Sequence, residues 1–370
     1  MKVLFISRST LYNDRGGDTI QIENTAHFLR NMGLDVTIRL ADEKIDYEVF
    51  DLIHFFNLIR PADILPHLTK SDKPFVVSTI FVDYSEYEQK VRGGVMGYIA
   101  RNISLDNIEY LKAIARFIIN GQKIKSLKYL ISGHRKSIKF IIQNAAILLP
   151  NSRSEYERIS IHYKIEQKFK VIPNAINPAL FKIPAGTGAR DLNQIICVGR
   201  IEGRKNQLNL IKALNNTAYK LIIIGSPSAN QQKYYELCLS EAQSNITFVS
   251  VLPQDKLIEY YQTAHVHVLP SWFETTGLSS LEAAVMGCKV VITAKGDTTE
   301  YFENYAYYCD PSSPASILKA IEEAMRAPFR DDFQNKILDC YTWKKAAEKT
   351  LEAYLEIKGD SNNENRNYRY

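Results

Sequence analysis

The chain has 370 residues, of which 45% are hydrophobic and 24% charged, and its formal net charge is +5 at pH 7. This composition is that of a soluble globular protein, and the length is too great for one hydrophobic core, so it predicts two domains of ordinary size. So small a net charge gives no support to nucleic acid or another polyanion as a partner.

Five cysteines are scattered along the chain without any Cys-x-x-Cys pair: Cys197, Cys238, Cys288, Cys309 and Cys340. An odd, scattered set is typical of reduced thiols and predicts neither a disulfide framework nor a zinc site. The apolar run after Met1 is too short for a signal peptide, and no run approaches the roughly 18 apolar residues of a membrane span. We therefore expect a cytoplasmic protein.

The first residues predict the start of a parallel sheet. Residues 3–6 form a continuous apolar run, as in a strand buried on both faces. A loop with Gly16 and Gly17 follows, then a helical pattern over residues 22–32 and a strand at 36–40. The glycine pair either lets the backbone approach a ligand closely or forms a flexible turn, which its spacing alone favours. It is not Gly-x-Gly-x-x-Gly, so a dinucleotide-dependent oxidoreductase is poorly supported.

Two more strand-like runs follow at residues 52–56 and 75–79, with a short helix between them near residues 62–68. His54 lies inside the first of these runs, and we interpret it as a core residue. Asp83, just beyond the second run, is either a ligand-contacting acid or an ordinary loop acid.

Residues 90–139 carry eleven Lys or Arg side chains but only two acids, Asp106 and Glu109. The apolar residues of this segment recur at helical spacing. Basic amphipathic helices of this kind either rest on an anionic membrane surface or expose their Lys and Arg to water, and the second is the more common for a charge run.

The N-terminal domain is predicted to close with a strand at residues 145–149, a helix at 155–162 and a last strand at 170–172. Residues 173–178 contain Pro and Asn and have the turn chemistry of a linker. We place the domain change after residue 177.

The second sheet is predicted to open with a strand at residues 195–199, directly followed by Arg200, Arg204 and Lys205 and then a helix at 208–214. A basic cluster between a strand end and a helix N-terminus suits a diphosphate, because Arg offers a two-pronged hydrogen-bonding group and Lys a mobile charge. Strands and helices then continue to alternate, with strands at 221–225, 246–251 and 290–293 and helices at 231–242, 255–264, 315–325 and 342–358. The polar, Asn-rich tail, 359–370, is expected to be disordered.

Residues 266–287 predict a strand, a turn and a helix that begins near Leu278. The turn contains four residues that we single out: Glu274, Thr275, Thr276 and Gly277. A helix N-terminus of small residues offers unpaired N–H groups and the positive end of the helix dipole to a phosphate. Glu282 follows Glu274 by eight positions, about 12 Å at most along a helix. Acids on both sides of an anion site suit a nucleotide sugar, although two acids at this spacing are also common by chance.

This pattern, Glu-x7-Glu after a Pro-Ser break and followed by Leu-Glu-Ala-Ala-x-x-Gly, resembles the donor signature of the retaining "group 1" glycosyltransferases, glycosyltransferase family 4. Arg200 and Lys205 behind a Val-Gly strand end resemble a second motif of that family. The resemblance implies the GT-B fold, with two Rossmann-like α/β domains, 1–177 and 178–341, whose parallel sheets face a cleft. It also implies that the last helix, 342–358, crosses back to the N-terminal domain.

The resemblance further implies transfer of a hexose, with retention, from a nucleoside diphosphate sugar to a glycan or lipid-linked acceptor, as in cell-surface polysaccharide or glycolipid assembly. Arg200, Lys205 and the N–H groups of residues 276–278 would bind the diphosphate, Glu274 the sugar and Glu282 the ribose.

In the N-terminal domain, Gly16 and Gly17 match a Gly-Gly loop that faces the donor phosphates or the acceptor. Asp83 matches the Asp of a His-Asp pair that would take the catalytic position at the acceptor. No His precedes it, which leaves open the group that meets the acceptor hydroxyl.

No Asp-x-Asp triplet occurs, so we expect no metal and no cofactor, with the cationic side chains in the place of a metal. Alternatives are another GT-B activity, such as a nucleotide-sugar epimerase or a phosphorylase, and a catalytically silent homologue that acts as a partner subunit. The basic helices would suit a peripheral position on the inner face of the cell membrane.

Overall fold

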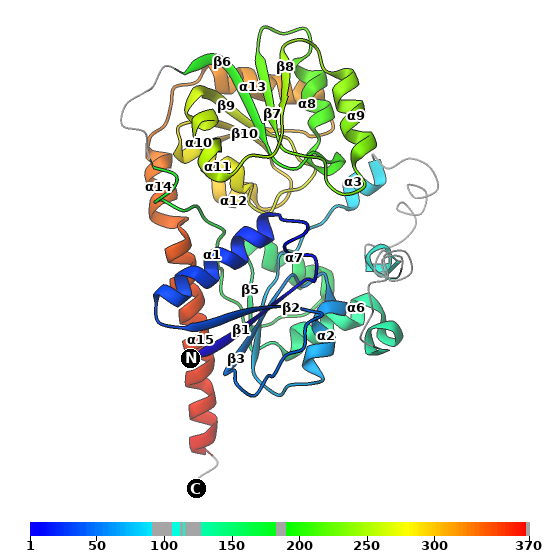
Figure 1. Cartoon of the computed structure of the whole chain (residues 1–370), viewed down its shortest axis with the longest axis vertical. Coiled ribbons are helices and arrows are strands. Elements are labelled where there is room, and N and C mark those ends of the chain that lie inside the picture. Colours follow the sequence, from blue (N-terminus) through cyan, green and yellow to red (C-terminus); the bar gives the residue numbers. More distant parts are fainter. Residues whose placement is uncertain (91–105, 112–113, 115–126, 183–189, 368–370) are drawn as a thin grey trace. The chain divides into compact units, whose positions relative to one another are not determined.

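The computed structural model describes residues 1–90, 106–111, 114, 127–182 and 190–367 (Figure 1). The chain forms two compact units, Met1–Pro173 with Trp343–Tyr370, and Asn174–Thr342. The chain thus passes from the first unit to the second between Pro173 and Asn174, a few residues before the boundary that we placed after residue 177. Each unit contains one parallel sheet, so the predicted pair of α/β domains is confirmed.

The sheet of the first unit has parallel strands in the order β2-β1-β3-β4-β5. They are β1 (Lys2–Ser7), β2 (Asp35–Leu40), β3 (Leu52–Phe56), β4 (Phe75–Ser78) and β5 (Ile147–Leu149). All coincide closely with predicted strands. The strand order turns back between β1 and β3, where connections leave in opposite directions along the sheet.

The helices of this unit cover both faces of its sheet. They include α1 (Gly17–Asn31), α2 (Pro61–Leu68), α3 (Ser85–Lys90), α6 (Leu127–Asn144), α7 (Arg153–Tyr163) and α15 (Trp343–Asn367). α1 packs against α15, and α2 packs against α6. Ser152 is the N-cap of α7, since Ser152 Oγ accepts a 2.9 Å hydrogen bond from Glu155 N.

The side chains of β3 alternate between the two faces of the sheet. Ile53 and Phe55 pack into the core on the side of α2 and α6. His54 lies on the other face, where Nδ1 is 2.6 Å from the Tyr354 hydroxyl and Nε2 is 2.8 Å from Ser78 Oγ. Burial lowers the pKa of His54 to about 3. His54 is therefore a neutral core residue, as expected, and it attaches α15 to the first sheet, which confirms that the last helix returns to this unit.

Residues 170–172 do not form a strand, so this prediction was wrong. The segment runs beside β5, and Lys170 N donates a 2.9 Å hydrogen bond to Leu148 O. The next bond of a parallel ladder needs an N–H at position 150, and Pro150 has none. The pairing is therefore reduced to an isolated bridge between Leu148 and Phe169.

The last helix, α15, continues to Asn367, past residue 358, where we predicted its end and the start of a disordered tail. The tail contains no proline, so nothing in it blocks continued backbone hydrogen bonding. Residues 368–370 lie outside the described part of the chain.

The sheet of the second unit has the order β11-β10-β9-β6-β7-β8, again all parallel. Its strands are β6 (Asp191–Val198), β7 (Lys220–Ile224), β8 (Ile246–Val249), β9 (Ala264–Leu269), β10 (Lys289–Thr293) and β11 (Ala306–Cys309). The helices are the 3-10 turn η1 (Gly203–Lys205), α8 (Gln207–Leu214), α9 (Gln232–Glu241), α10 (Gln254–Thr263), α11 (Leu278–Val285), α12 (Thr298–Phe302), α13 (Pro314–Arg326) and α14 (Asp332–Cys340). β11, η1, α12 and α14 were not predicted.

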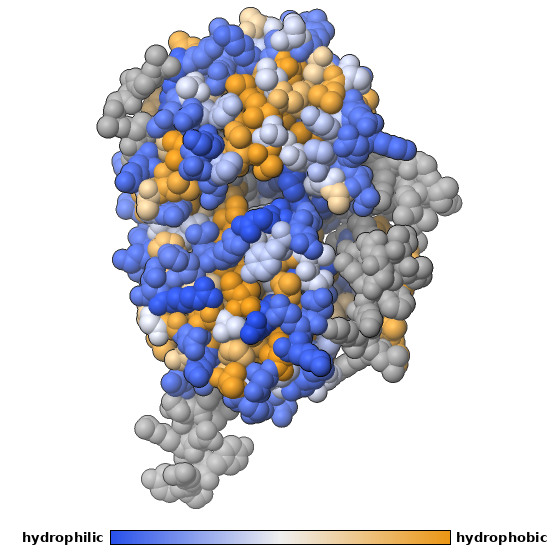
Figure 2. Space-filling view, viewed as in Figure 1, coloured by the Kyte–Doolittle hydropathy of each residue, from blue (hydrophilic) through white to orange (hydrophobic). Residues whose placement is uncertain are grey.

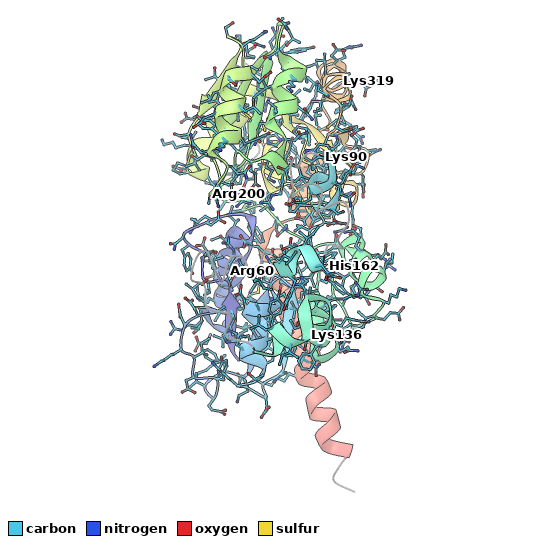
Figure 3. All side chains as sticks on the ribbon, turned by 90° about the vertical axis from the view of Figure 1, so that its right-hand side faces the viewer. Arg60, Lys90, Lys136, His162, Arg200 and Lys319 are labelled. Carbon is cyan, nitrogen blue, oxygen red and sulfur yellow. The ribbon has the colours of Figure 1, made fainter. Side chains whose placement is uncertain are left out.

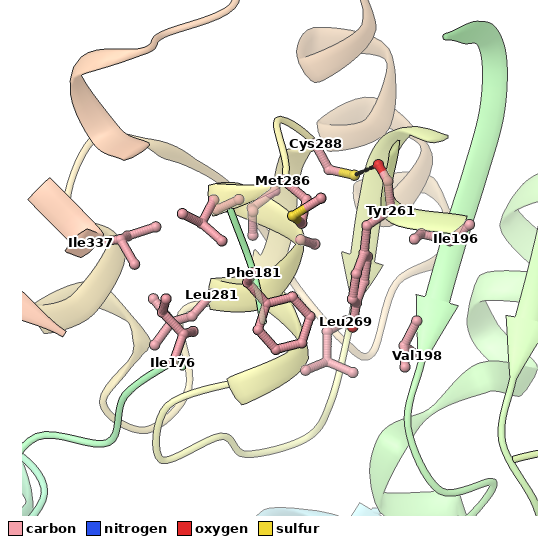
Figure 4. Packing of buried hydrophobic residues seen from close by; sticks show 14 of the residues in the cluster. Ile176, Phe181, Ile196, Val198, Tyr261, Leu269, Leu281, Met286, Cys288 and Ile337 are labelled. Carbon is pink, nitrogen blue, oxygen red and sulfur yellow. Dashed lines mark hydrogen bonds between the residues drawn. The ribbon is translucent and has the colours of Figure 1, made fainter. Parts of the chain in front are cut away.

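This second sheet is buried on both faces. In β6, Ile195 and Cys197 pack with α8, α9 and α13, whereas Ile196 and Val198 pack with α10, α11 and α14 on the other face (Figure 4). Because neither face meets water, the strands are nearly continuous apolar runs, which is the signal that made them predictable.

Most of the basic segment 90–139 lies outside the described residues, so its proposed contact with a membrane stays a prediction. Among the residues that the structure does describe, no helix combines the length and the apolar character needed to span a bilayer. The face shown in Figure 2 is mostly hydrophilic, with apolar residues gathered in separate groups.

Candidate functional site

The candidate site lies at the carboxyl ends of β6 and β9, at the point where the strand order of the second sheet turns back. The two strands are neighbours, with Ile196 paired to His267. The segments that follow them, from Arg200 and from Ser271, therefore emerge side by side. In open parallel sheets, ligands bind at this switch point.

Lys205 and Glu274 form an ion pair that joins these two segments. Lys205 Nζ contacts Glu274 Oε1, and Ser271 Oγ donates a 2.6 Å hydrogen bond to the same oxygen. Glu274 is only 6% exposed. Its second oxygen, Oε2, has no hydrogen-bond partner among the described residues, so it remains able to accept a bond from a ligand.

The backbone of Glu274 is fixed by the loop after β10. Glu274 N donates to Lys295 O at 3.1 Å, and Asp297 N donates to Glu274 O at 2.9 Å. Gly296 lies between these two bonds with φ +98°, and a Cβ there would come within 2.0 Å of Glu274 O. Only glycine fits this close approach of two backbones.

The N-terminus of α11 lies next to Glu274 in the chain. Gly277 caps it with φ +74°, and the first N–H groups that bond to Gly277 O are those of Ser280 and Leu281. The earlier N–H groups, at positions 277–279, precede the intrahelical bonds and offer an anion site, one residue further along the chain than the predicted 276–278.

Two further predicted residues of this turn differ in their surroundings. The hydroxyl of Thr276 is buried and accepts a 3.1 Å hydrogen bond from Asn174 Nδ2. The Thr276 hydroxyl therefore already has a partner within the protein. Thr275 is half-buried.

Glu202 lies between the two arginines of the basic cluster and was missed in the sequence. It is 3% exposed and contacts Arg204 Nη2 at 2.9 Å and Arg200 Nη2 at 3.5 Å. Burial alone would raise the pKa of Glu202, but the charges of Arg204 and Arg200 outweigh burial and lower it. The carboxylate thus stays ionised and orients both guanidinium groups. Arg200 is labelled in Figure 3.

Glu282 lies inside α11 and is held from α10. Gln254 Nε2 donates to its Oε1 at 2.8 Å, and the Tyr261 hydroxyl donates to its Oε2 at 3.0 Å. Tyr261 itself is packed in the core of the unit (Figure 4). Burial raises the pKa of Glu282 to about 7. Neither Gln254 nor Tyr261 could be found from the sequence, because both come from another element.

The remaining predicted residues belong to the first unit. Gly16 is the N-cap of α1, with extended backbone, and Gly16 N donates to Thr19 Oγ1 at 3.2 Å, while Gly17 is the first helical residue. Asp83 Oδ1 accepts a 2.8 Å hydrogen bond from Ser85 N at the start of α3. Asp83 thus stabilises the local turn through this bond, and a role of these three residues toward a ligand stays a prediction.

The described residues contain no group of three or more His, Cys, Asp or Glu side chains placed to hold a metal ion. The expectation that the protein needs no metal is not tested by this and stays a prediction.

Substitution of Gly296 tests the backbone support of Glu274. Gly296→Ala should destabilise the protein by roughly 3 kcal/mol or more, because the new Cβ must displace Glu274. Gly33→Ala is the matched control, since Gly33 also has positive φ (+87°) but open space around the Cβ position; it should cost only about 1–2 kcal/mol. Thermal unfolding followed by circular dichroism measures both, and equal losses would contradict the role of Gly296.

The pKa of Glu282 predicts a pH dependence of stability. Its folded value of about 7 lies above its ordinary value of 4.5, so the stability that it contributes is complete below pH 4.5 and is lost as the pH rises through 7. Glu282→Gln should therefore gain stability over the wild type between pH 5 and pH 8, by about 3 kcal/mol at most. The exposed Glu236, which also accepts from a glutamine, is the control. If the difference in melting temperature between Glu282→Gln and the wild type does not change with pH, the raised pKa of Glu282 is contradicted.

Comparison with known proteins found similarity to glycosyltransferases, in sequence over part of the chain and in fold over most of it. Residues 182–338 match the family model "Glycosyl transferases group 1". An uncharacterized glycosyltransferase of Methanocaldococcus jannaschii is 27% identical over 236 residues, which cover 57% of this chain and 60% of that protein.

Solved structures match over nearly the whole chain. Sucrose-phosphate synthase from Thermosynechococcus elongatus has a TM-score of 0.75 at 15% identity, covering 97% of this chain and all of that one. HepE of Anabaena in complex with UDP-glucose has a TM-score of 0.63 at 14% identity, covering 98% and 100%. The chain has the GT-B fold, and its residues 182–338 are related in sequence to the group 1 glycosyltransferases.

Proposed function

We propose that the protein is a retaining glycosyltransferase of family 4 that transfers a hexose from a nucleoside diphosphate sugar to a glycan or lipid-linked acceptor. The observation that carries this proposal is the largely buried Lys205–Glu274 pair beside the N-terminus of α11, at the switch point of the second sheet. The cation and the unpaired N–H groups there suit the diphosphate of such a donor, and the acceptor oxygen of Glu274 suits a hydroxyl of its sugar.

The donor would lie across this site in a defined order. Arg200, Lys205 and the N–H groups of residues 277–279 would bind the diphosphate, where cationic groups and a helix dipole favour negative charge. Glu274 Oε2 would accept a hydrogen bond from a sugar hydroxyl. Glu282 would accept hydrogen bonds from the ribose hydroxyls, with Gln254 and Tyr261 holding its carboxylate. The UDP-glucose complex of HepE supports the donor class.

The difficult step of such a transfer is departure of the nucleoside diphosphate from an oxocarbenium-like carbon. Negative charge then grows on the bridging oxygen, and the positive groups that already point at it stabilise the transition state more than the ground state. Removal of one such group typically costs about 3–4 kcal/mol. These side chains would take the part of a metal, in a chain without an Asp-x-Asp triplet.

The acceptor side of the proposal rests on the first unit. Gly16 and Gly17 would contact donor phosphates or acceptor, and Asp83 would contact the acceptor. The excess of Lys and Arg over residues 90–139 supports a cytoplasmic enzyme that meets a lipid-linked or growing glycan acceptor at the anionic inner face of the membrane.

A donor screen and a product analysis test the activity. Thermal shift with UDP-, GDP- and ADP-sugars should show one donor that raises the melting temperature, and acceptor mixtures should then release nucleoside diphosphate. Proton NMR of the product should show the anomeric configuration of the donor. Inversion would contradict retention, release independent of acceptor would favour another GT-B reaction, and binding without turnover on any acceptor would favour a silent homologue.

Substitution of Lys205 tests the central cation. Lys205→Ala should lower kcat by about 10²–10³-fold, because a charge that stabilises the leaving group is lost. Lys212→Ala is the matched control, since Lys212 is exposed on the adjacent helix α8 and its loss should leave kcat unchanged. Circular dichroism should show both variants folded, and a Lys205→Ala enzyme with unchanged kcat would contradict the proposed role.

A further inference from the structure

The first unit contains a cavity that the donor site does not use. It has a volume of about 390 Å³ and lies against α2 and α6. Leu65 and Phe140 form an apolar wall. The polar lining includes Ser132, Lys136, Ser137 and Lys139. A cavity of this size is in the range of small-molecule sites.

A break in α6 brings a helix N-terminus to this cavity. Gly133 has φ +72° and ψ +175°, so the helix stops there and a new helical segment runs from His134 to Asn144. The N–H groups of the first turn of a helix have no intrahelical acceptors, and the helix dipole makes this end positive. Cavity-lining residues lie on both sides of the break, with Ser132 before it and Lys136 and Ser137 after it.

Ser137, which lines the cavity, is a second observation that points to a ligand. It is 2% exposed, and its Oγ has no hydrogen-bond partner among the described residues. A helical serine usually bonds to the carbonyl four residues earlier, but here that residue is Gly133, where the helix is broken. A buried hydroxyl without a partner costs about 1–3 kcal/mol, and a ligand oxygen in the cavity would remove this cost.

The charges at the cavity are also uncompensated. Neither Lys136 nor Lys139 has an ion-pair partner in the part of the chain that the structure describes. The neighbouring Arg135, by contrast, contacts Asp106 Oδ2 at 2.8 Å. Figure 3 labels Lys136 on α6. Two unpaired ammonium groups beside a helix N-terminus and a free hydroxyl form a set of donors for an anion with several oxygens.

We propose that this cavity is a binding site for a phosphate monoester, separate from the donor site. Lys136 and Lys139 supply the charge, Ser137 Oγ and the N–H groups after Gly133 donate to phosphate oxygens, and Leu65 and Phe140 contact the apolar part of the ligand. The phosphate belongs either to an anionic lipid headgroup or to a soluble phosphate ester. Leu130 and Ile131, which are 39% and 78% exposed just before the break, are suited to the lipid source.

The test uses the full chain, without any nucleotide sugar, and two probes. One is sedimentation with phosphatidylcholine vesicles with and without phosphatidic acid, and the other is calorimetric titration with glycerol 3-phosphate. Binding to the acidic vesicles alone identifies a lipid headgroup, and binding to glycerol 3-phosphate identifies a soluble ester. Both results support the site, and because no donor is present they do not depend on the proposed transferase activity.

Three variants separate a built pocket from general electrostatic attraction. Lys136→Ala/Lys139→Ala should weaken binding more than tenfold, and Ser137→Ala, which keeps every charge, should weaken it about fivefold. Lys319→Ala/Lys344→Ala removes the same charge from exposed positions and should have little effect. Ser137→Ala should not lower the melting temperature, since its hydroxyl has no partner to lose. Failure to bind either probe, or binding by Ser137→Ala equal to that of the wild type, would overturn the proposal.

Discussion

Lys205 and Glu274 come from segments that follow two different strands, yet they meet as a largely buried ion pair. Burial of both charges costs several kcal/mol in lost hydration, and the pair recovers this only with good geometry and additional hydrogen bonds. Ser271 supplies one such bond to Glu274 Oε1. The second carboxylate oxygen remains available to a ligand hydroxyl. The proposed reading of the donor depends on this one contact.

The surrounding fold explains why the pair has this geometry. Parallel β6 and β9 end at the same edge of the sheet and direct both segments to one place. Gly296 allows the loop after β10 to approach the backbone of Glu274, and Gly277 turns the chain into α11 so that its N-terminus lies beside the carboxylate. Glu202 and Gln254 then orient the groups on either side. A site built on strand ends and buried partners is already organised before a ligand arrives, which is what transition-state stabilisation requires.

Much of the fold was predictable because strands buried on both faces are continuous apolar runs. β11 was missed because two of its residues, Tyr307 and Tyr308, are only half-buried and break the apolar pattern. The segment at 170–172 was predicted as a strand from its own residues. Its sequence gives no sign that pairing will fail, because the missing N–H belongs to Pro150, directly after the neighbouring strand β5. In the candidate site, Arg200, Lys205, Glu274 and Glu282 could be singled out through their spacing together with the resemblance to the group 1 motifs. Gln254 and Tyr261 were not, since their relation to Glu282 exists only once α10 packs beside α11.

A crystal structure with the nucleoside diphosphate sugar found by the donor screen tests the central claim most directly. The account predicts both phosphates within hydrogen-bonding distance of Arg200, Lys205 and the N–H groups of residues 277–279, with a sugar hydroxyl on Glu274 and the ribose on Glu282. Phosphates bound anywhere else, with the Lys205–Glu274 pair untouched, would contradict it.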